Sequence, residues 1–288
     1  MSKVAIVTGG TSGIGLQTAL SLRNDHGYAV YVFSRHDFYQ EGLNHVRCDV
    51  SSEEAVTSAA AEVINREGRL DLVVNCAGMG ISGALEFTDP DDAKRLFDVN
   101  FFGTVNVNKA CLAHLRATRG RIINISSVAA VVPIPFQSFY SASKAAINSY
   151  SLALANELKP FGVEVCAVMP GDTATGFTAA RKKSEEGDDL YQGRISRSVA
   201  KMEKDEIGGH PESSAALIYD RLQLQAGKSV NEDITGQLES EAGISVICKV
   251  KAVPPGNSFF VSENPVIVTG FSDTKRSDLH NHFFHPFV

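Results

Sequence analysis

The sequence predicts an α/β fold in which helices cover both faces of a doubly wound parallel sheet, giving three αβα layers. Two observations predict it: short apolar, β-branched runs alternate with helical patterns, and glycine-rich or polar motifs directly follow these runs. Crossovers between parallel strands are right-handed, so the pattern winds into a sheet with helices on both faces. Because the strands are parallel, their carboxyl ends lie at one edge of the sheet, where ligands bind in this fold. We therefore expect the motifs to share one crevice.

The first strand, residues 3–7, runs into a glycine-rich turn and then into a helix that continues to about residue 22. The turn reads TGGTSGIG. Its glycines permit a tight turn, let a pyrophosphate approach the backbone, and allow close packing of helix on strand. The N–H groups at the helix start then receive the phosphates. This pattern predicts a Rossmann-type dinucleotide site, and the residues expected in it are Gly9, Thr11, Ser12, Gly13, Ile14 and Gly15.

The second strand, residues 28–33, is followed by Ser34 and Arg35, where an NAD-binding chain is expected to carry an acidic residue for the ribose hydroxyls. A guanidinium binds phosphate bidentately and so favours a cofactor with a 2′-phosphate. We therefore expect NADP(H) in preference to NAD(H). Asp37 is the competing residue, but it lies past the strand end, where a solvated loop aspartate is the alternative.

The third and fourth strands contribute the adenosine side of the expected site. The third strand closes at Asp49 and Val50, and the Asp49 carboxylate can accept a hydrogen bond from the adenine amino group. The fourth strand, residues 72–74, leads into Asn75, Ala77 and Gly78. Small residues there let the chain run past the cofactor.

The candidate catalytic residues follow the fifth strand, residues 121–125, which comes after a helix expected over about residues 91–117. Ser127 lies just past that strand, and Tyr140 and Lys144 lie on the next helix, which is expected to run to about Lys159. Positions i and i+4 share a helix face, so the Lys144 charge can sit beside the Tyr140 phenol and lower its pKa toward the neutral range. Such a set suits carbonyl–alcohol interconversion, although a Tyr–Lys pair by itself is more often a solvated surface pair.

The motifs TGGTSGIG, CDV, NCAG, VNFFG, ISS, YSASK and PGDTAT together resemble the short-chain dehydrogenase/reductase family from Lys3 to about Phe177. The resemblance implies that Asn100 orders a water in a proton relay, Ser127 binds the substrate oxygen and Tyr140 is the general acid/base. It also implies that Lys144 lowers the tyrosine's pKa and bonds the nicotinamide ribose. Around the nicotinamide it places Tyr140, Lys144, Pro170, Gly171, Thr173 and Thr175. The sequence around the YSASK and PGDTAT motifs is most similar to the hydroxysteroid and retinol dehydrogenase-like branch, which acts on lipophilic ketones and alcohols.

The expected catalytic domain spans residues 1–217, with the sixth strand at 163–168 and a substrate lid at about 177–209. Within the lid, the expected apolar contacts come from Phe177, Leu190 or Tyr191. Residues 218–288 form a divergent, atypical C-terminal segment with an expected strand at 244–250. Three histidines near the C-terminus fit no tight ligand template, so no metal is expected.

Composition excludes several other classes of function. The chain has 288 residues and a net charge of −6, and it has no basic block for nucleic acid and no uninterrupted apolar stretch long enough for a bilayer. Five cysteines without CxxC spacing, and a first strand that leaves no room for a signal peptide, favour a cytoplasmic protein. The family resemblance implies a homodimer or homotetramer.

The sequence thus predicts an NADP(H)-dependent oxidoreductase that interconverts a ketone or aldehyde and an alcohol on a small or lipophilic substrate. The alternative is a catalytically silent, redox-sensing nucleotide-binding module with an altered C-terminus. The complete Asn100–Ser127–Tyr140–Lys144 set argues against that alternative, because a binding module needs no proton relay.

Overall fold

The structure is a computed structural model that describes residues 2–171, 173, 175–206 and 244–247. Its main sheet has the strand order β3-β2-β1-β4-β6-β7-β9, in which the first six are parallel and β9 pairs antiparallel with β7. This arrangement confirms the doubly wound parallel sheet. The strands are β1 Val4–Thr8, β2 Ala29–Ser34, β3 Asn44–Arg47, β4 Leu72–Asn75, β6 Arg121–Ile125, β7 Glu164–Pro170 and β9 Ile244–Ile247.

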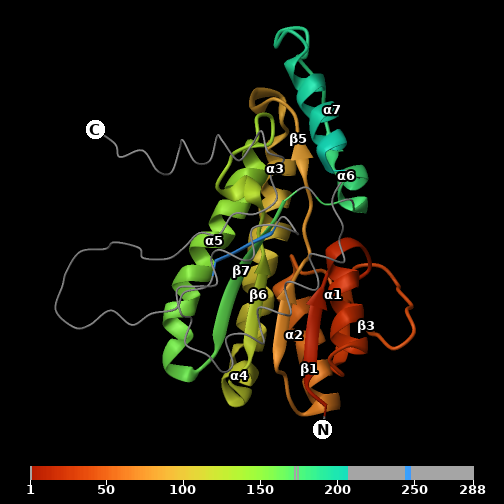
Figure 1. Cartoon of the computed structure of the whole chain (residues 1–288), viewed down its shortest axis with the longest axis vertical. Coiled ribbons are helices and arrows are strands. Elements are labelled where there is room, and N and C mark those ends of the chain that lie inside the picture. Colours follow the sequence, from red (N-terminus) through yellow and green to blue (C-terminus); the bar gives the residue numbers. More distant parts are fainter. Residues whose placement is uncertain (1, 172, 174, 207–243, 248–288) are drawn as a thin grey trace, which may run out of the picture.

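Helices cover both faces of this sheet (Figure 1). In β1, Val4 and Ile6 pack into one apolar cluster with residues of α2, α4 and α5, whereas Ala5 and Val7 pack into a second cluster with residues of α1. This period of two is what a strand buried on both faces requires. The helices are α1 Gly13–Asn24, α2 Glu53–Glu67, α3 Pro90–Phe97, α4 Gly103–Thr118, α5 Ser138–Leu158, α6 Gly176–Ala180 and α7 Arg194–Glu206.

The helix expected over about residues 91–117 contains a break in its regular geometry. Between α3 and α4, residues Asp98–Phe102 form a π-helical turn, in which the Gly103 N–H bonds to the Asp98 carbonyl. The expected single helix does not include this turn, which interrupts the regular pattern for only five residues. The turn carries Asn100, whose side chain is fully buried.

Two other boundaries agree with the sequence. Helix α5 ends at Leu158, before a 3₁₀ turn at Lys159–Phe161 that closes on Gly162 with a φ of 71°. The expected strand at 244–250 is present over Ile244–Ile247. Its remaining residues, and the rest of the expected C-terminal segment, lie outside the described residues.

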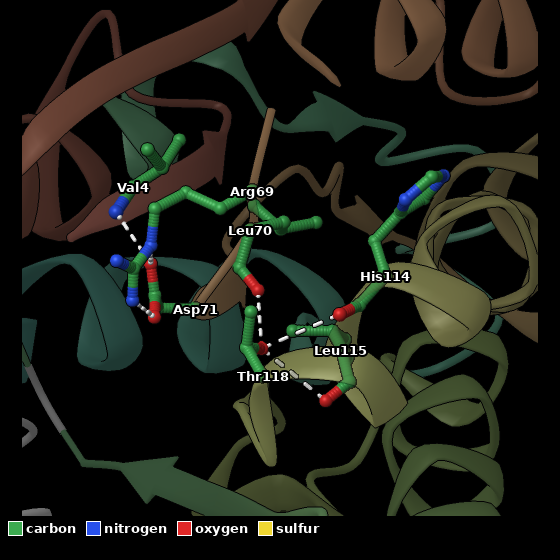
Figure 2. A network of polar contacts seen from close by, with 7 residues as sticks. All are labelled: Val4, Arg69, Leu70, Asp71, His114, Leu115 and Thr118. Atoms are coloured by element: carbon green, nitrogen blue, oxygen red, sulfur yellow. Dashed lines mark hydrogen bonds and ion pairs between the residues drawn. The ribbon is translucent and has the colours of Figure 1, made fainter. Parts of the chain in front are cut away.

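The edge of the sheet opposite the carboxyl ends is closed by a polar network (Figure 2). The Val4 N–H donates to Asp71 Oδ2 at 2.8 Å, and the Arg69 guanidinium makes two further bonds to the same carboxylate, at 2.9 and 2.6 Å. The Thr118 hydroxyl donates to the Leu70 carbonyl at 2.6 Å. These bonds tie the start of β1, the chain entering β4 and the end of α4 together at this edge.

The segment expected to form the lid lies beyond the carboxyl ends of the parallel strands (Figure 1). There, β5 (Ile81–Ser82) pairs in parallel with β8 (Lys182–Lys183), between α6 and α7. Lys182 pairs with Asp92 of α3, and Lys183 pairs with Glu203 of α7. These backbone and charge contacts attach the segment expected to form the lid to β5, α3 and α7.

Candidate active site

A cleft of about 360 Å³ opens at the carboxyl ends of the parallel strands. Most of the residues predicted from separate motifs line it together, as the sheet topology requires. The predicted residues that line the cleft are Gly9, Thr11, Ser12, Gly13, Ile14, Gly15, Ser34, Arg35, Val50, Ala77, Gly78, Ser127, Tyr140, Lys144, Pro170, Gly171, Thr173 and Thr175. Asp49, Asn75 and Asn100 are not among its lining residues.

The glycine-rich turn is shaped by contacts that exclude side chains. A Cβ on Gly15 would lie 2.4 Å from the Gly9 carbonyl oxygen, and a Cβ on Gly9 would lie 2.9 Å from the Ala77 Cα. Gly9 and Gly13 also have φ values of 64° and 54°, a region that favours glycine. Helix α1 starts at Gly13 without a side-chain hydrogen bond from Ser12, so its first N–H groups face the cleft as a site for phosphate.

The ribose end of the cleft carries a positive charge. Arg35 is exposed and lines the cleft next to Ser34. The Asp49 carboxylate instead accepts hydrogen bonds from the Ser51 N–H at 3.0 Å and the Ser51 hydroxyl at 2.7 Å. Partial burial opposes ionisation of Asp49, but these bonds and the Arg35 charge leave its pKa below its usual value. Asp49 therefore stabilises the turn after β3 and is not among the residues that line the cleft.

Asn75 faces the sheet interior. Side chains alternate between the two faces of a strand, so Asn75 points to the same face of β4 as Val73, which packs toward α4. Its Nδ2 donates to Asn108 Oδ1 at 2.8 Å and to Asn124 Oδ1 at 2.9 Å, and Asn124 Nδ2 donates to Ser151 Oγ at 2.9 Å. This buried chain of amides joins β4, α4, β6 and α5. It holds the strands that deliver the site without contacting the cleft.

Lys144 is a buried cation, with 5% of its surface exposed. Its Nζ donates to the Ile125 carbonyl at 2.8 Å and lies 5.7 Å from the centroid of the Tyr140 ring. Burial lowers the pKa of Lys144 to about 8, and the neighbouring Cys76 opposes this shift. The expected proximity of ammonium and phenol ring is therefore present, one helical turn apart on α5.

Ser127 begins the short 3₁₀ turn Val128–Ala130, and its Oγ accepts from the Ala129 N–H at 3.1 Å. Because the oxygen accepts this bond, the hydroxyl proton can be directed to a substrate oxygen in the cleft. The preceding Ser126 donates instead to the Lys144 carbonyl at 2.9 Å, which fixes the β6 loop to α5.

Asn100 organises the loop that passes the lysine. Its Oδ1 accepts from the Met79 N–H at 2.8 Å, while its Nδ2 donates to the Met79 carbonyl at 3.0 Å and to Ser143 Oγ at 3.1 Å. A Cβ on Gly78 would lie 3.3 Å from Asn100 Oδ1 and 3.8 Å from Lys144 Nζ. The glycine therefore lets the loop fit between these two side chains.

The segment expected to form a lid contacts the site through Phe177, whose ring centroid lies 5.8 Å from that of Tyr140. Leu190, the second residue expected to make an apolar contact, is 66% exposed and points to solvent. Tyr191 packs its ring against Phe136 and donates its hydroxyl to Glu86, on the outside of the lid. Sequence reasoning missed the residues of α6 and α7 that turn inward, such as Met202, which is 8% exposed.

Several lining residues were not among the predicted site residues. Gln137, Cys76, Val128, Ile134 and Arg181 all line the cleft. Gln137 had one available signal, since a residue three positions before Tyr140 shares its face at the start of a helix. Burial raises the pKa of the Cys76 thiol to about 12, so it is a protonated wall residue at neutral pH.

With this geometry in place, comparison with known proteins identifies the class. Residues 3–186 match the family described as short chain dehydrogenase, so the chain belongs to the short-chain dehydrogenase/reductase family. As a member of this family, the chain is an oxidoreductase that acts on CH–OH or ketone groups.

Individual relatives narrow the comparison. The chain is 43% identical over 224 residues to a 3-ketodihydrosphingosine reductase of Bacteroides thetaiotaomicron, covering 75% of this chain and 82% of that protein. It is 34% identical over 180 residues to an NADPH-dependent 1-acyldihydroxyacetone phosphate reductase of Schizosaccharomyces pombe, covering 60% of each. A solved short-chain dehydrogenase from Streptomyces avermitilis has a TM-score of 0.71 at 32% identity, covering 80% of this chain and 86% of that one.

The described residues also bear on partners and cofactors. The glycine turn leaves space that any side chain would fill, and it presents helix N–H groups, which fits the pyrophosphate of a nicotinamide dinucleotide. None of the helices in the described part of the chain is both long enough and apolar enough to cross a bilayer.

Proposed function

We propose that this protein is an NADP(H)-dependent reductase that converts a ketone on a lipophilic substrate to an alcohol. The observation that carries the proposal is that Ser127, Tyr140 and the buried Lys144 line one cleft with the glycine-rich turn. Hydroxyl donors and a pKa-shifted cation beside a dinucleotide site are the parts that carbonyl reduction requires.

When bound, the nicotinamide supplies or accepts the hydride. Tyr140 then donates its phenolic proton to the carbonyl oxygen as charge develops there, and Ser127 donates a second hydrogen bond to the same oxygen. The Lys144 ammonium, held in place by the Ile125 carbonyl, stabilises the phenolate that Tyr140 leaves behind. Asn100 fixes the loop over Lys144, and the water relay expected of it is part of this proposal.

The preference for NADP(H) over NAD(H) rests on Arg35. Its exposed guanidinium lines the ribose end of the cleft, where it can bind a 2′-phosphate, while Asp49 is bonded to Ser51. The name of the fission-yeast relative states NADPH dependence, which supports the same assignment.

The substrate class rests on the wall of the cleft near Tyr140. Val128, Ile134, Phe177 and Ala180 give that wall an apolar surface. Two relatives are named for reducing lipid ketones, which supports a long-chain substrate. A steroid or retinoid substrate of the hydroxysteroid and retinol dehydrogenase-like branch is the narrower prediction. A homodimer or homotetramer and a cytoplasmic location also stay predictions.

The test is NADPH oxidation with 3-ketodihydrosphingosine, an acyl-dihydroxyacetone phosphate and a steroid ketone as separate substrates. We expect turnover of at least one long-chain ketone. Tyr140→Phe should lose turnover by about 10²–10³-fold or more while NADPH still binds. Tyr39→Phe is the matched control, because Tyr39 is 89% exposed and is not among the cleft residues. NADPH binding without turnover of any ketone would instead favour the silent nucleotide-binding module.

A further inference from the structure

Gln137 is a buried amide in the cleft wall that the proposed chemistry does not use. It immediately precedes α5, three residues before Tyr140, and it lines the cleft with only 3% of its surface exposed. Its Oε1 has no hydrogen-bond partner among the described residues. Of the described residues that line the cleft, it is also the only Asn or Gln.

The backbone on both sides of Gln137 fixes its place relative to Tyr140. Its N–H donates to the Ile134 carbonyl at 3.1 Å, and its own carbonyl accepts from the Ser141 N–H at 2.9 Å. The second bond closes the first turn of α5, which is the turn that carries Tyr140. Residues three positions apart at such a turn have Cβ atoms about 5–6 Å apart, so one ligand can contact both side chains.

Met202 sets the orientation of the amide. Gln137 Nε2 donates to the thioether sulphur of Met202, which lies on α7. If the amide were turned over, Oε1 would face this sulphur, and a thioether has no proton to donate. The observed orientation therefore gives Nε2 a partner and leaves Oε1 as an acceptor without a donor. A buried acceptor of this kind costs free energy that a donor on a ligand recovers.

The charges of the cleft indicate which kind of donor fits. Its described lining residues include cations, among them Arg35 and Lys144, and no Asp or Glu. An ammonium group on the substrate would therefore meet like charges without a carboxylate to offset them. A hydroxyl donates a proton to Oε1 and carries no charge, so it is the better match for Gln137.

We propose that Gln137 is a specificity-determining residue whose Oε1 accepts a hydrogen bond from a hydroxyl on the carbon next to the substrate's ketone. The ketone oxygen binds to Ser127 and Tyr140, and the neighbouring hydroxyl satisfies the buried amide. This assignment rests on the proposed function and names a substrate class for it: lipophilic α-hydroxy ketones, in preference to ketones without a neighbouring donor. A ketone that lacks the donor leaves Oε1 unpaired in a closed site, and that difference produces the discrimination.

The experiment compares three ketones in NADPH-dependent reduction: 1-hydroxy-2-dodecanone, 1-methoxy-2-dodecanone and 1-amino-2-dodecanone. The first two carry the same electron-withdrawing oxygen beside the carbonyl, but only the hydroxyl can donate a hydrogen bond. The readout is the ratio of kcat/KM for the hydroxy ketone to kcat/KM for the methoxy ketone. One neutral hydrogen bond predicts a wild-type ratio of about 3- to 10-fold.

Two substitutions separate the acceptor oxygen of Gln137 from its bulk. Gln137→Met has a similar length and no amide oxygen, so the ratio should fall to about one. Gln137→Glu keeps an acceptor oxygen at the same place, so the ratio should stay at or above the wild-type value. Gln17→Met is the matched control, because Gln17 lies on α1 and is not among the cleft residues. NADPH affinity and Tm, measured for each variant, show whether the fold is retained.

The outcomes separate the two proposals. A wild-type ratio of one or less would overturn the role of Gln137 while leaving the reductase intact, and this result does not depend on how any variant folds. The same holds if folded Gln137→Met keeps the wild-type ratio, if folded Gln137→Glu loses it, or if the amino ketone is the preferred substrate. No reduction of any ketone, with NADPH bound, would overturn the proposed function itself.

Discussion

Replacing Lys144 with methionine separates what the ammonium contributes to chemistry from what it costs the fold. The side chain is 5% exposed, and its charge is stabilised mainly by the Ile125 carbonyl at 2.8 Å. Methionine has a similar length and no charge. We expect the variant to lose ketone reduction, because the Tyr140 phenolate loses its neighbouring cation, and to keep or raise its stability near neutral pH.

The magnitude follows from the pKa of Lys144. Burial lowers it from 10.5 to about 8, an interval that corresponds to about 3 kcal/mol of cost for keeping the charged form. Methionine avoids this cost, but it also lacks the hydrogen bond to the Ile125 carbonyl, and the loss of that bond destabilises the fold by about 1–2 kcal/mol. The variant should therefore be about 1–2 kcal/mol more stable than the wild type near pH 7.

The sign of the pH dependence provides the sharper test. Between its folded and unfolded pKa values, Lys144 binds more protons in the unfolded chain, so wild-type stability rises with pH in that interval. The burial cost is fully present below about pH 8 and is relieved above it. Relative to Lys144→Met, the wild type should gain about 2 kcal/mol between about pH 7 and pH 9.5.

Urea unfolding of both proteins at these two pH values measures this difference, and other titrating groups cancel in the comparison. A stability difference that does not change with pH would show that Lys144 is not a buried, destabilised cation. So would a wild type that is clearly the more stable protein near neutral pH. Either result would refute the reasoning that connects its burial to Tyr140.

Three further predictions concern the cofactor cleft and its support. Gly15→Ala should abolish NADPH binding and lower Tm, because its Cβ would lie 2.4 Å from the Gly9 carbonyl oxygen; unchanged binding by fluorescence titration would contradict this. Arg35→Glu should weaken NADPH about 10- to 100-fold more than NADH, measured as the ratio of KM values, and an unchanged ratio would place the 2′-phosphate elsewhere. Asn124→Ala should cost about 2–4 kcal/mol in urea unfolding, because Asn75 and Ser151 each lose one buried hydrogen-bond partner; a change below about 1 kcal/mol would show that water replaces it.

The sequence predicted the fold and most of the cleft wall because those features depend on local patterns. A strand followed by a glycine turn determines where the backbone of Gly13 and Gly15 must lie, and parallel topology brings Ser127 and Thr175 to the same edge. These inferences need only the order of elements and their handedness. No knowledge of side-chain packing enters them.

Prediction was weaker wherever a side chain could face either way. Asn75 follows its strand's alternation toward α4 and Asp49 bonds to its own turn, although both stand in motifs near the cofactor. The lid posed a different problem, because its residues meet the site only through tertiary contacts. Gln137, Arg181 and Met202 come from three separate segments, and no spacing in the chain relates them.

The surplus residue in the π-helical turn at Asp98–Phe102 restricts how this part of the chain can evolve. Deleting one residue there would restore regular geometry but rotate everything on one side by about 100°. Either Asn100 would swing away from the Gly78 loop, or α3 would turn its buried Leu96 toward water. A change in the length of this helix by a single residue would therefore break either the contact of Asn100 with the Gly78 loop or the packing of Leu96.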